Sequence, residues 1–86
     1  MTAEEAEAVR IYVKLSERQR DVLRLLISGV TNYRAMAARL GISKSTVCNH
    51  TQAVMQLTRT SDRTGLVLFV LRRPILERFL QQGVTE

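Results

Sequence analysis

Signals for the start of an α-helix recur along the whole chain, and little of the sequence between them favours any other structure. Thr2 and Glu5 form a capping-box pattern, Ser16 and Ser43 each precede an amphipathic stretch, and Pro74 suits the first turn of a last helix. Two pairs of neighbours offer the remaining caps: Thr31 or Asn32, and Ser61 or Asp62. With only four glycines and one proline, and no β-branched alternation, the chain is predicted to be an all-α, small helical bundle. The expected helices span residues 3–14, 17–28, 33–40, 43–57, 63–72 and 74–82.

Apolar side chains at helical spacing predict which face of each helix is buried. Gly29, Gly41 and Gly83 mark the expected ends of three helices. His50 is expected to be a packed histidine that bonds to the backbone. The predicted buried faces are Val9, Tyr12 and Val13; Val22, Leu23, Leu26 and Ile27; Met36, Ala37 and Leu40; Val47, His50, Val54 and Leu57; and Ile75, Leu76, Phe79 and Leu80.

The helices expected at 33–40 and 43–57 are joined by a short turn, which matches a helix-turn-helix. Ala37 is small where the two helices would cross, and Val47 would fill the space between them. Gly41 allows the positive φ that such a turn requires. Because any short helical hairpin can carry this trio, the pattern needs support from the chemistry of the second helix.

The outward face of the helix at 43–57 is polar but nearly uncharged. A helical wheel puts Ser45, Cys48, Asn49, Gln52 and Gln56 on this face. An ordinary solvated face carries Glu and Lys more often. Asn and Gln suit the N6 and N7 edge of adenine in the major groove of DNA, so this face is predicted to read bases. Cys48 is interpreted as a small groove-facing contact in preference to a redox switch.

Positive charge is concentrated in the middle of the sequence. Thirteen Lys and Arg stand against eight Asp and Glu, and no acidic residue occurs from 22 to 61. Such a field attracts polyanions such as DNA, although a basic surface without a specific partner has the same composition. The starts of the two helices add N–H groups that suit phosphate. The predicted phosphate contacts are Thr31, Asn32, Tyr33, Arg34, Lys44, Ser45 and Thr46.

Three segments of the chain resemble one family: LSERQRDVLRLLISG (15–29), AMAARLGISKSTVCNH (35–50) and SDRTGLVLFVLRR (61–73). They are similar to the LuxR/GerE-type helix-turn-helix domain of bacterial transcription factors. The resemblance implies a four-helix domain at 15–73, sequence-specific binding of double-stranded DNA, and dimerisation through its last helix. It implies base contacts by Cys48, Asn49 and Gln52. An N-terminal helix (1–14) and a C-terminal helix and tail (74–86) would flank this domain.

The sequence also departs from the family pattern. Cys48 stands where Lys is usual, Gln19 and Ala35 replace two usual Glu residues, and the GVTNY segment is one residue longer than the usual turn. These changes bear on the DNA sequence that is recognised more than on the fold.

The segment LVLFVL (66–71) places apolar side chains all around one helix, more than a small core can cover. Exposed apolar surface usually marks an interface, so a homodimer is predicted; the added terminal helices are the alternative cover. Two recognition helices would then address half-sites about one DNA turn apart, or a multiple of it. The predicted dimer contacts are Leu66, Phe69, Val70 and Arg73.

Other function classes find less support. Cys48 and His50 lie two residues apart on different helix faces and cannot form a nucleophile–base pair, so no enzyme is predicted. One His and one Cys make no zinc site, and no cofactor is expected. No apolar run of about 18 residues spans a membrane, and the acidic start resembles no signal peptide. Together with the single cysteine, this favours a cytoplasmic protein.

Two alternatives keep the helix-turn-helix fold. In one, the chain is a protein-interaction module that binds another regulator or RNA polymerase, as the Cys48 departure and the apolar helix at 63–72 suggest. In the other, it is a promoter-binding piece of a sigma factor, similar to region four, although the D-R-T segment (62–64) argues against this.

Overall fold

The computed structural model describes residues 1–82, and these form six α-helices. The predicted end of the last helix at Gly83 lies outside the described residues. Within residues 1–82, no helix has the length and apolar character to cross a membrane. The helices are α1 (Ala3–Lys14), α2 (Glu17–Ile27), α3 (Tyr33–Leu40), α4 (Lys44–Thr58), α5 (Arg63–Leu71) and α6 (Pro74–Gln82).

Side-chain caps set where the helices begin, and each lies within a residue of the predicted start. Thr2 and Glu5 close the capping box at 3.1 and 2.8 Å. Asn32, not Thr31, caps α3 by accepting from the Arg34 and Ala35 amides. Asp62, not Ser61, caps α5 by accepting from the Gly65 amide at 2.7 Å. These bonds satisfy amides that the first helical turn leaves without partners, so the starts were predictable from local sequence.

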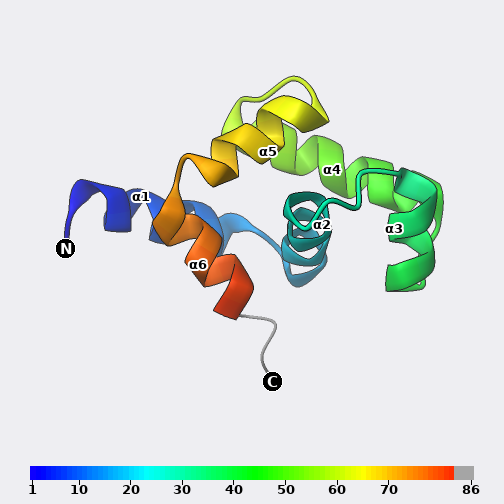
Figure 1. Cartoon of the computed structure of the whole chain (residues 1–86), viewed down its shortest axis with the longest axis horizontal. Helices are drawn as coiled ribbons and strands as arrows, with labels where there is room; N and C mark the ends of the chain where they lie inside the picture. The colour runs from blue at the N-terminus through cyan, green and yellow to red at the C-terminus, as the bar shows by residue number, and fades with distance from the viewer. Residues whose placement is uncertain (83–86) are drawn as a thin grey trace.

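The core is built around α2, which lies in the middle of the molecule and contacts α3, α4, α5 and α6 (Figure 1). The helix-turn-helix formed by α3 and α4 has the predicted geometry. Gly41 has a φ of +68°, Ala37 is buried, and Val47 has no exposed surface. The turn thus holds α4 against α2, with its opposite face directed to solvent.

The predicted buried face of α1 was wrong. Val13 is 65% exposed and Val9 36%, whereas Ala8 and Ile11 are buried. The predicted stripe and the stripe that is buried are about 100° apart on the helix, and the position of the partner helix determines which of them is covered. Here α1 packs on α6, where the small Ala8 permits close approach. Only Tyr12 of the predicted trio contributes, in an edge-to-face contact with Phe79 whose ring centres are 5.7 Å apart.

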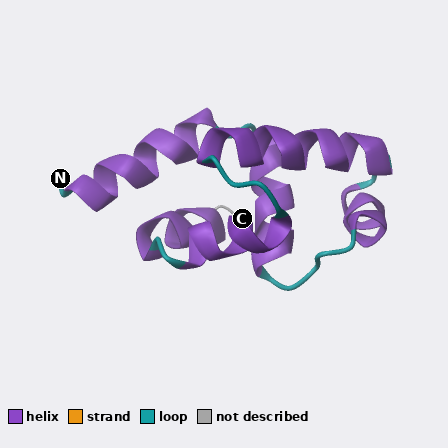
Figure 2. Cartoon of the chain, turned by 90° about the horizontal axis from the view of Figure 1, so that it is seen from above, coloured by secondary structure: helices purple, strands orange, loops and turns teal. Residues whose placement is uncertain are grey.

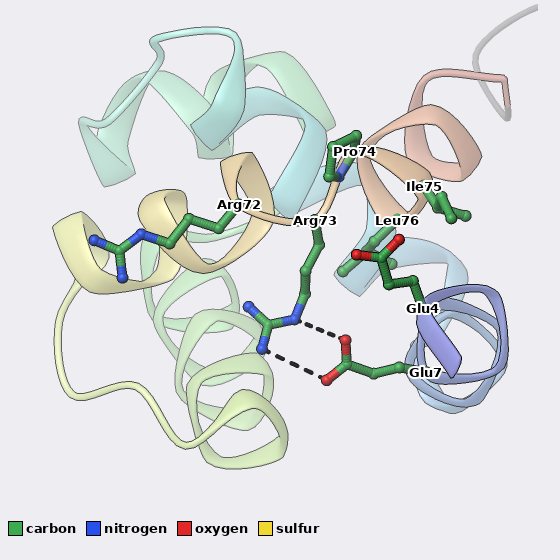
Figure 3. A pocket seen from close by; sticks show the side chains of 7 residues that line it. All are labelled: Glu4, Glu7, Arg72, Arg73, Pro74, Ile75 and Leu76. Atoms are coloured by element: carbon green, nitrogen blue, oxygen red, sulfur yellow. Dashed lines mark hydrogen bonds and ion pairs between the residues drawn. The ribbon is translucent and has the colours of Figure 1, made fainter. Parts of the chain in front are cut away.

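Polar clamps hold α1 on the bundle. Arg73, at the turn between α5 and α6, donates from Nε to Glu7 Oε1 on α1 at 3.0 Å (Figure 3). On the far side, Arg20 of α2 donates from Nη2 to the Tyr12 carbonyl at 2.9 Å, and its guanidinium lies 3.8 Å from the centre of the Tyr12 ring. The N-terminal helix is therefore a fixed part of the bundle.

Candidate nucleic-acid interface

The buried face of α4 centres on Thr51, which the sequence-based wheel omitted. Thr51 has no exposed surface, and its hydroxyl donates to the Val47 carbonyl at 2.8 Å. Thr58 repeats this arrangement with the Val54 carbonyl at 2.9 Å. Because each hydroxyl is satisfied within its own helix, threonine can serve as a core residue. His50 is only half-buried, and its ring forms no hydrogen bond with any of residues 1–82. The expected hydrogen bond from this ring to the backbone is therefore absent.

The opposite face of α4 is open to solvent, and its side chains recur every three or four residues, which keeps them in one line along the helix. Asn49 and Gln52 are exposed in the middle of this line, and Cys48 beside them is half-buried. The exposed line, called the outer stripe below, consists of Ser45, Asn49, Gln52 and Gln56.

The N-terminus of α4 carries a hydroxyl cluster. Ser43 accepts from the Thr46 amide at 3.1 Å, and its Oγ lies 2.8 Å from Thr46 Oγ1 and 3.3 Å from Ser45 Oγ. Lys44 is exposed beside this cap. Because the first amides of a helix point outward and the helix dipole is positive there, this end can accept an anion.

Residues from the starts of three helices line one hollow of about 460 Å³. Arg34 lies in the first turn of α3, Lys44 is the first residue of α4 and Arg63 is the first residue of α5, and no acidic side chain lines the space between them. The complete lining, called the cationic hollow below, is Thr31, Asn32, Tyr33, Arg34, Lys44 and Arg63. The three positive charges here suit a phosphate, because guanidinium and ammonium groups donate strong hydrogen bonds to phosphate oxygens.

Arg63 is the residue of this hollow that the sequence analysis missed. Its guanidinium lies 4.6 Å from the centre of the Tyr33 ring, and its Nη1 donates to the Thr31 carbonyl. The available signal was a cation directly after the Asp62 cap, in the D-R-T segment that served only as a family signature. Arg24, by contrast, lies in the segment 22–61 that has no acidic residue, but its guanidinium is not free to bind DNA. It forms an ion pair with Asp21 at 2.8 Å and donates to the Leu80 carbonyl.

The structure buries two of the four predicted dimer contacts within the chain. Leu66 and Val70 have no exposed surface, because α5 packs them against α2 and α6. Arg73 is held inside the chain by Glu7, and its guanidinium lies 3.6 Å from the ring centre of the half-buried Phe69. The apolar surface that α5 leaves open consists instead of Leu68 and Leu71, which are 43% and 47% exposed.

Comparison with known proteins agrees with this arrangement. The pattern that describes the bacterial regulatory proteins of the luxR family matches residues 13–70, which is more than half of the chain. The chain belongs to the LuxR family. It is therefore a helix-turn-helix, DNA-binding domain of a transcriptional regulator, and this family is not one of enzymes.

One relative is the two-component response regulator PprB of Pseudomonas aeruginosa, which is 41% identical over 58 residues. The match covers 67% of this chain and 21% of PprB, so the chain spans about a fifth of that relative. No solved structure gives a significant match.

The structure explains how this LuxR domain tolerates two of its departures. Gln19 accepts from the Ser16 amide at 2.9 Å, which is the capping-box bond that a Glu would make. The longer GVTNY segment lies in the connection between α2 and α3, where Val30 packs against the core and its amide donates to the Leu25 carbonyl at 2.9 Å.

Proposed function

We propose that this LuxR-type domain binds double-stranded DNA sequence-specifically, with α4 in the major groove. The observation that carries the proposal is the position of the amide-bearing outer stripe directly beside the cationic hollow. A recognition helix needs base-reading side chains in the groove and cations where the groove meets the backbone. The outer stripe supplies the first, and Arg34, Lys44 and Arg63 supply the second.

In this proposal Asn49 and Gln52 hydrogen-bond to base edges, and Cys48 makes a small contact beside them. A good bidentate contact of Asn or Gln with adenine discriminates against the wrong base by about 1–3 kcal/mol. Ser45 and Thr46 hold their hydroxyls at the same helix start and assist the phosphate contacts. Asn32 takes part through the helix start that it caps, because its own oxygen is occupied by the Arg34 and Ala35 amides.

We also propose that the protein acts as a homodimer in the cytoplasm, where bacterial DNA lies. Leu68 and Leu71 support the dimer, because both are nearly half exposed on α5. A two-fold arrangement about this surface would direct two α4 helices to half-sites about one DNA turn apart. The same two leucines favour the alternative function, contact with RNA polymerase or another regulator.

The test is a titration of labelled duplexes, first enriched from a random library by the protein itself, at several salt concentrations. Three phosphate contacts per chain, or six in the proposed dimer, predict a loss of affinity of at least about 10³-fold between about 50 and 200 mM salt. Enriched duplexes are expected to bind at least about 10³-fold more tightly than scrambled ones. Weak binding without sequence preference would refute the proposal, and recovery of a stoichiometric protein partner without duplex affinity would favour the alternative.

A further inference from the structure

A second group of cations lies at the opposite end of α4. Arg10 and Lys14 of α1 and Arg59 at the end of α4 line one hollow of about 310 Å³. All three side chains are exposed, and none forms an ion pair or hydrogen bond with another of residues 1–82. Glu7 also lines this hollow, but its carboxylate is occupied by Arg73 at 3.0 Å. The residues that line this hollow therefore carry a net positive charge.

Arg59 occupies a backbone position that does not favour arginine. Its φ of 58° and ψ of 39° are left-handed, and it is the single non-glycine residue with positive φ among residues 1–82. Helices usually end with Gly or Asn in this conformation, because a Cβ atom is unfavourable there. Such an unfavourable backbone conformation at an exposed arginine is a reason to ask what its side chain binds.

Arg59 also lies close to the outer stripe. It directly follows the last residue of α4 and stands three positions after Gln56, where the outer stripe ends, so it lies at the C-terminal end of the predicted recognition helix. The 15 residues of α4 extend for about 22 Å, whereas the major groove is about 12 Å wide. A helix of this length in the groove brings both of its ends to the phosphate strands.

The N-terminal helix lies on the same edge of the molecule as α4. Figure 2 shows α1 and α4 along one edge with their C-terminal ends together, in agreement with the hollow that they share. A duplex against the outer stripe therefore passes Arg10 and Lys14 as well. Arg10 lies outside the part of the chain that matches the LuxR family.

We propose that Arg10, Lys14 and Arg59 form a second phosphate-binding site for duplex DNA, at the C-terminal end of the recognition helix. The proposal rests on the proposed function, because α4 must occupy the groove. With this site, DNA is held by cations at both ends of α4, and α1 becomes part of the DNA-binding surface as well as a cover for the core.

The test compares salt-dependent binding of the wild-type chain and its variants to one duplex that the wild type enriches from a random library. Arg59→Gly removes the guanidinium and suits the positive φ, so the fold is retained, as a thermal unfolding curve will show. We expect this variant to lose about one unit of the slope of log affinity against log salt for each chain bound to the duplex. Adding Arg10→Gln and Lys14→Gln is expected to remove up to about three units per bound chain in total.

The controls separate this site from a general effect of charge. Arg59→Lys keeps the cation and is expected to retain most of the slope. Arg78→Gln removes an exposed arginine from α6 and is expected to leave both the slope and the affinity unchanged. A triple variant that binds with the wild-type slope overturns the second site while the proposed function stands. A wild-type chain that binds no duplex overturns both.

Discussion

Thr51 lies at the centre of the interface between α4 and the core because one hydrogen bond satisfies its hydroxyl. The bond to the Val47 carbonyl is internal to the helix, so the side chain offers only methyl and satisfied oxygen to its neighbours. Hydrophobicity alone assigns this position to the surface, and His50 next to it was predicted to be buried in its place. The true buried stripe, Val47, Thr51, Val54 and Thr58, follows only when local bonding of threonine is considered.

This placement predicts unequal effects of one substitution at neighbouring positions. Thr51→Lys buries an ammonium without a partner and is expected to lower the free energy of unfolding by about 3 kcal/mol or more. His50→Lys leaves the charge at a half-open site and is expected to cost less than about 1 kcal/mol. Urea unfolding monitored by circular dichroism measures both values. Equal losses for the two variants would show that the buried face of α4 is not centred on Thr51.

Gly41 makes a second prediction at the scale of one residue. Its φ is +68°, and a Cβ placed there meets no atom within 4 Å. Gly41→Ala therefore introduces backbone strain without a steric clash, and should lower the free energy of unfolding by about 1–2 kcal/mol. Thermal unfolding provides the measurement. A loss much larger than this would mean that the turn is packed more closely than the structure indicates.

The boundaries of the six helices could be predicted because caps act over three residues or fewer, as at Ser16 and Asp62. The face that each helix buries was predictable where one apolar stripe dominates, as for Val22, Leu23 and Leu26 of α2. It was not predictable for α1, because two adjacent stripes compete and the position of α6 decides between them.

The role of Arg73 also depends on how the helices pack, and it leads to a prediction for the packing of α1 on the bundle. Inside the chain it donates to Glu7 and to the Phe69 carbonyl, each at 3.0 Å. Arg73→Gln should therefore lower the free energy of unfolding by about 1–2 kcal/mol. Combined with Glu7→Gln, the loss should be smaller than the sum of the two single losses.

If Arg73→Gln left the stability of the monomer unchanged and weakened self-association instead, Arg73 would act between two chains. That result would restore the sequence-based prediction for this residue. Glu7→Gln alone serves as the matched control, because it removes the same ion pair from the side of α1.

At the scale of the whole molecule, the candidate interface is a product of folding that no single segment contains. The cationic hollow unites residues 31–34 with Lys44 and Arg63, which the sequence separates by up to about thirty positions. The phosphate-binding residues at the starts of α3 and α4 could be predicted from sequence, since each set lies at the start of a helix in the predicted helix-turn-helix. Arg63 could not be predicted in this way, because only the folded chain brings the guanidinium at the start of α5 to Tyr33 and Thr31.

The proposed homodimer is tested at this scale through Leu68 and Leu71. Because both are exposed, Leu68→Glu with Leu71→Glu is expected to retain the stability of the monomer and to weaken self-association at least tenfold. Sedimentation equilibrium over a range of concentrations measures the change, and Val13→Glu on α1 is a control at another exposed apolar site. A wild-type chain that stays monomeric at high concentration and when bound to DNA would contradict the dimer.

The central claim is that the outer stripe of α4 reads bases while the cationic hollow holds phosphate. The most direct measurement is the affinity of Asn49→Ala, Gln52→Ala and Lys44→Ala for the enriched duplex and for a panel with each base pair substituted in turn. We predict that the first two variants lose about 1–3 kcal/mol of discrimination at particular base pairs and keep the salt slope, whereas Lys44→Ala weakens binding to every duplex and lowers the slope by about one per bound chain. Full wild-type base preference in both Asn49→Ala and Gln52→Ala would contradict the account.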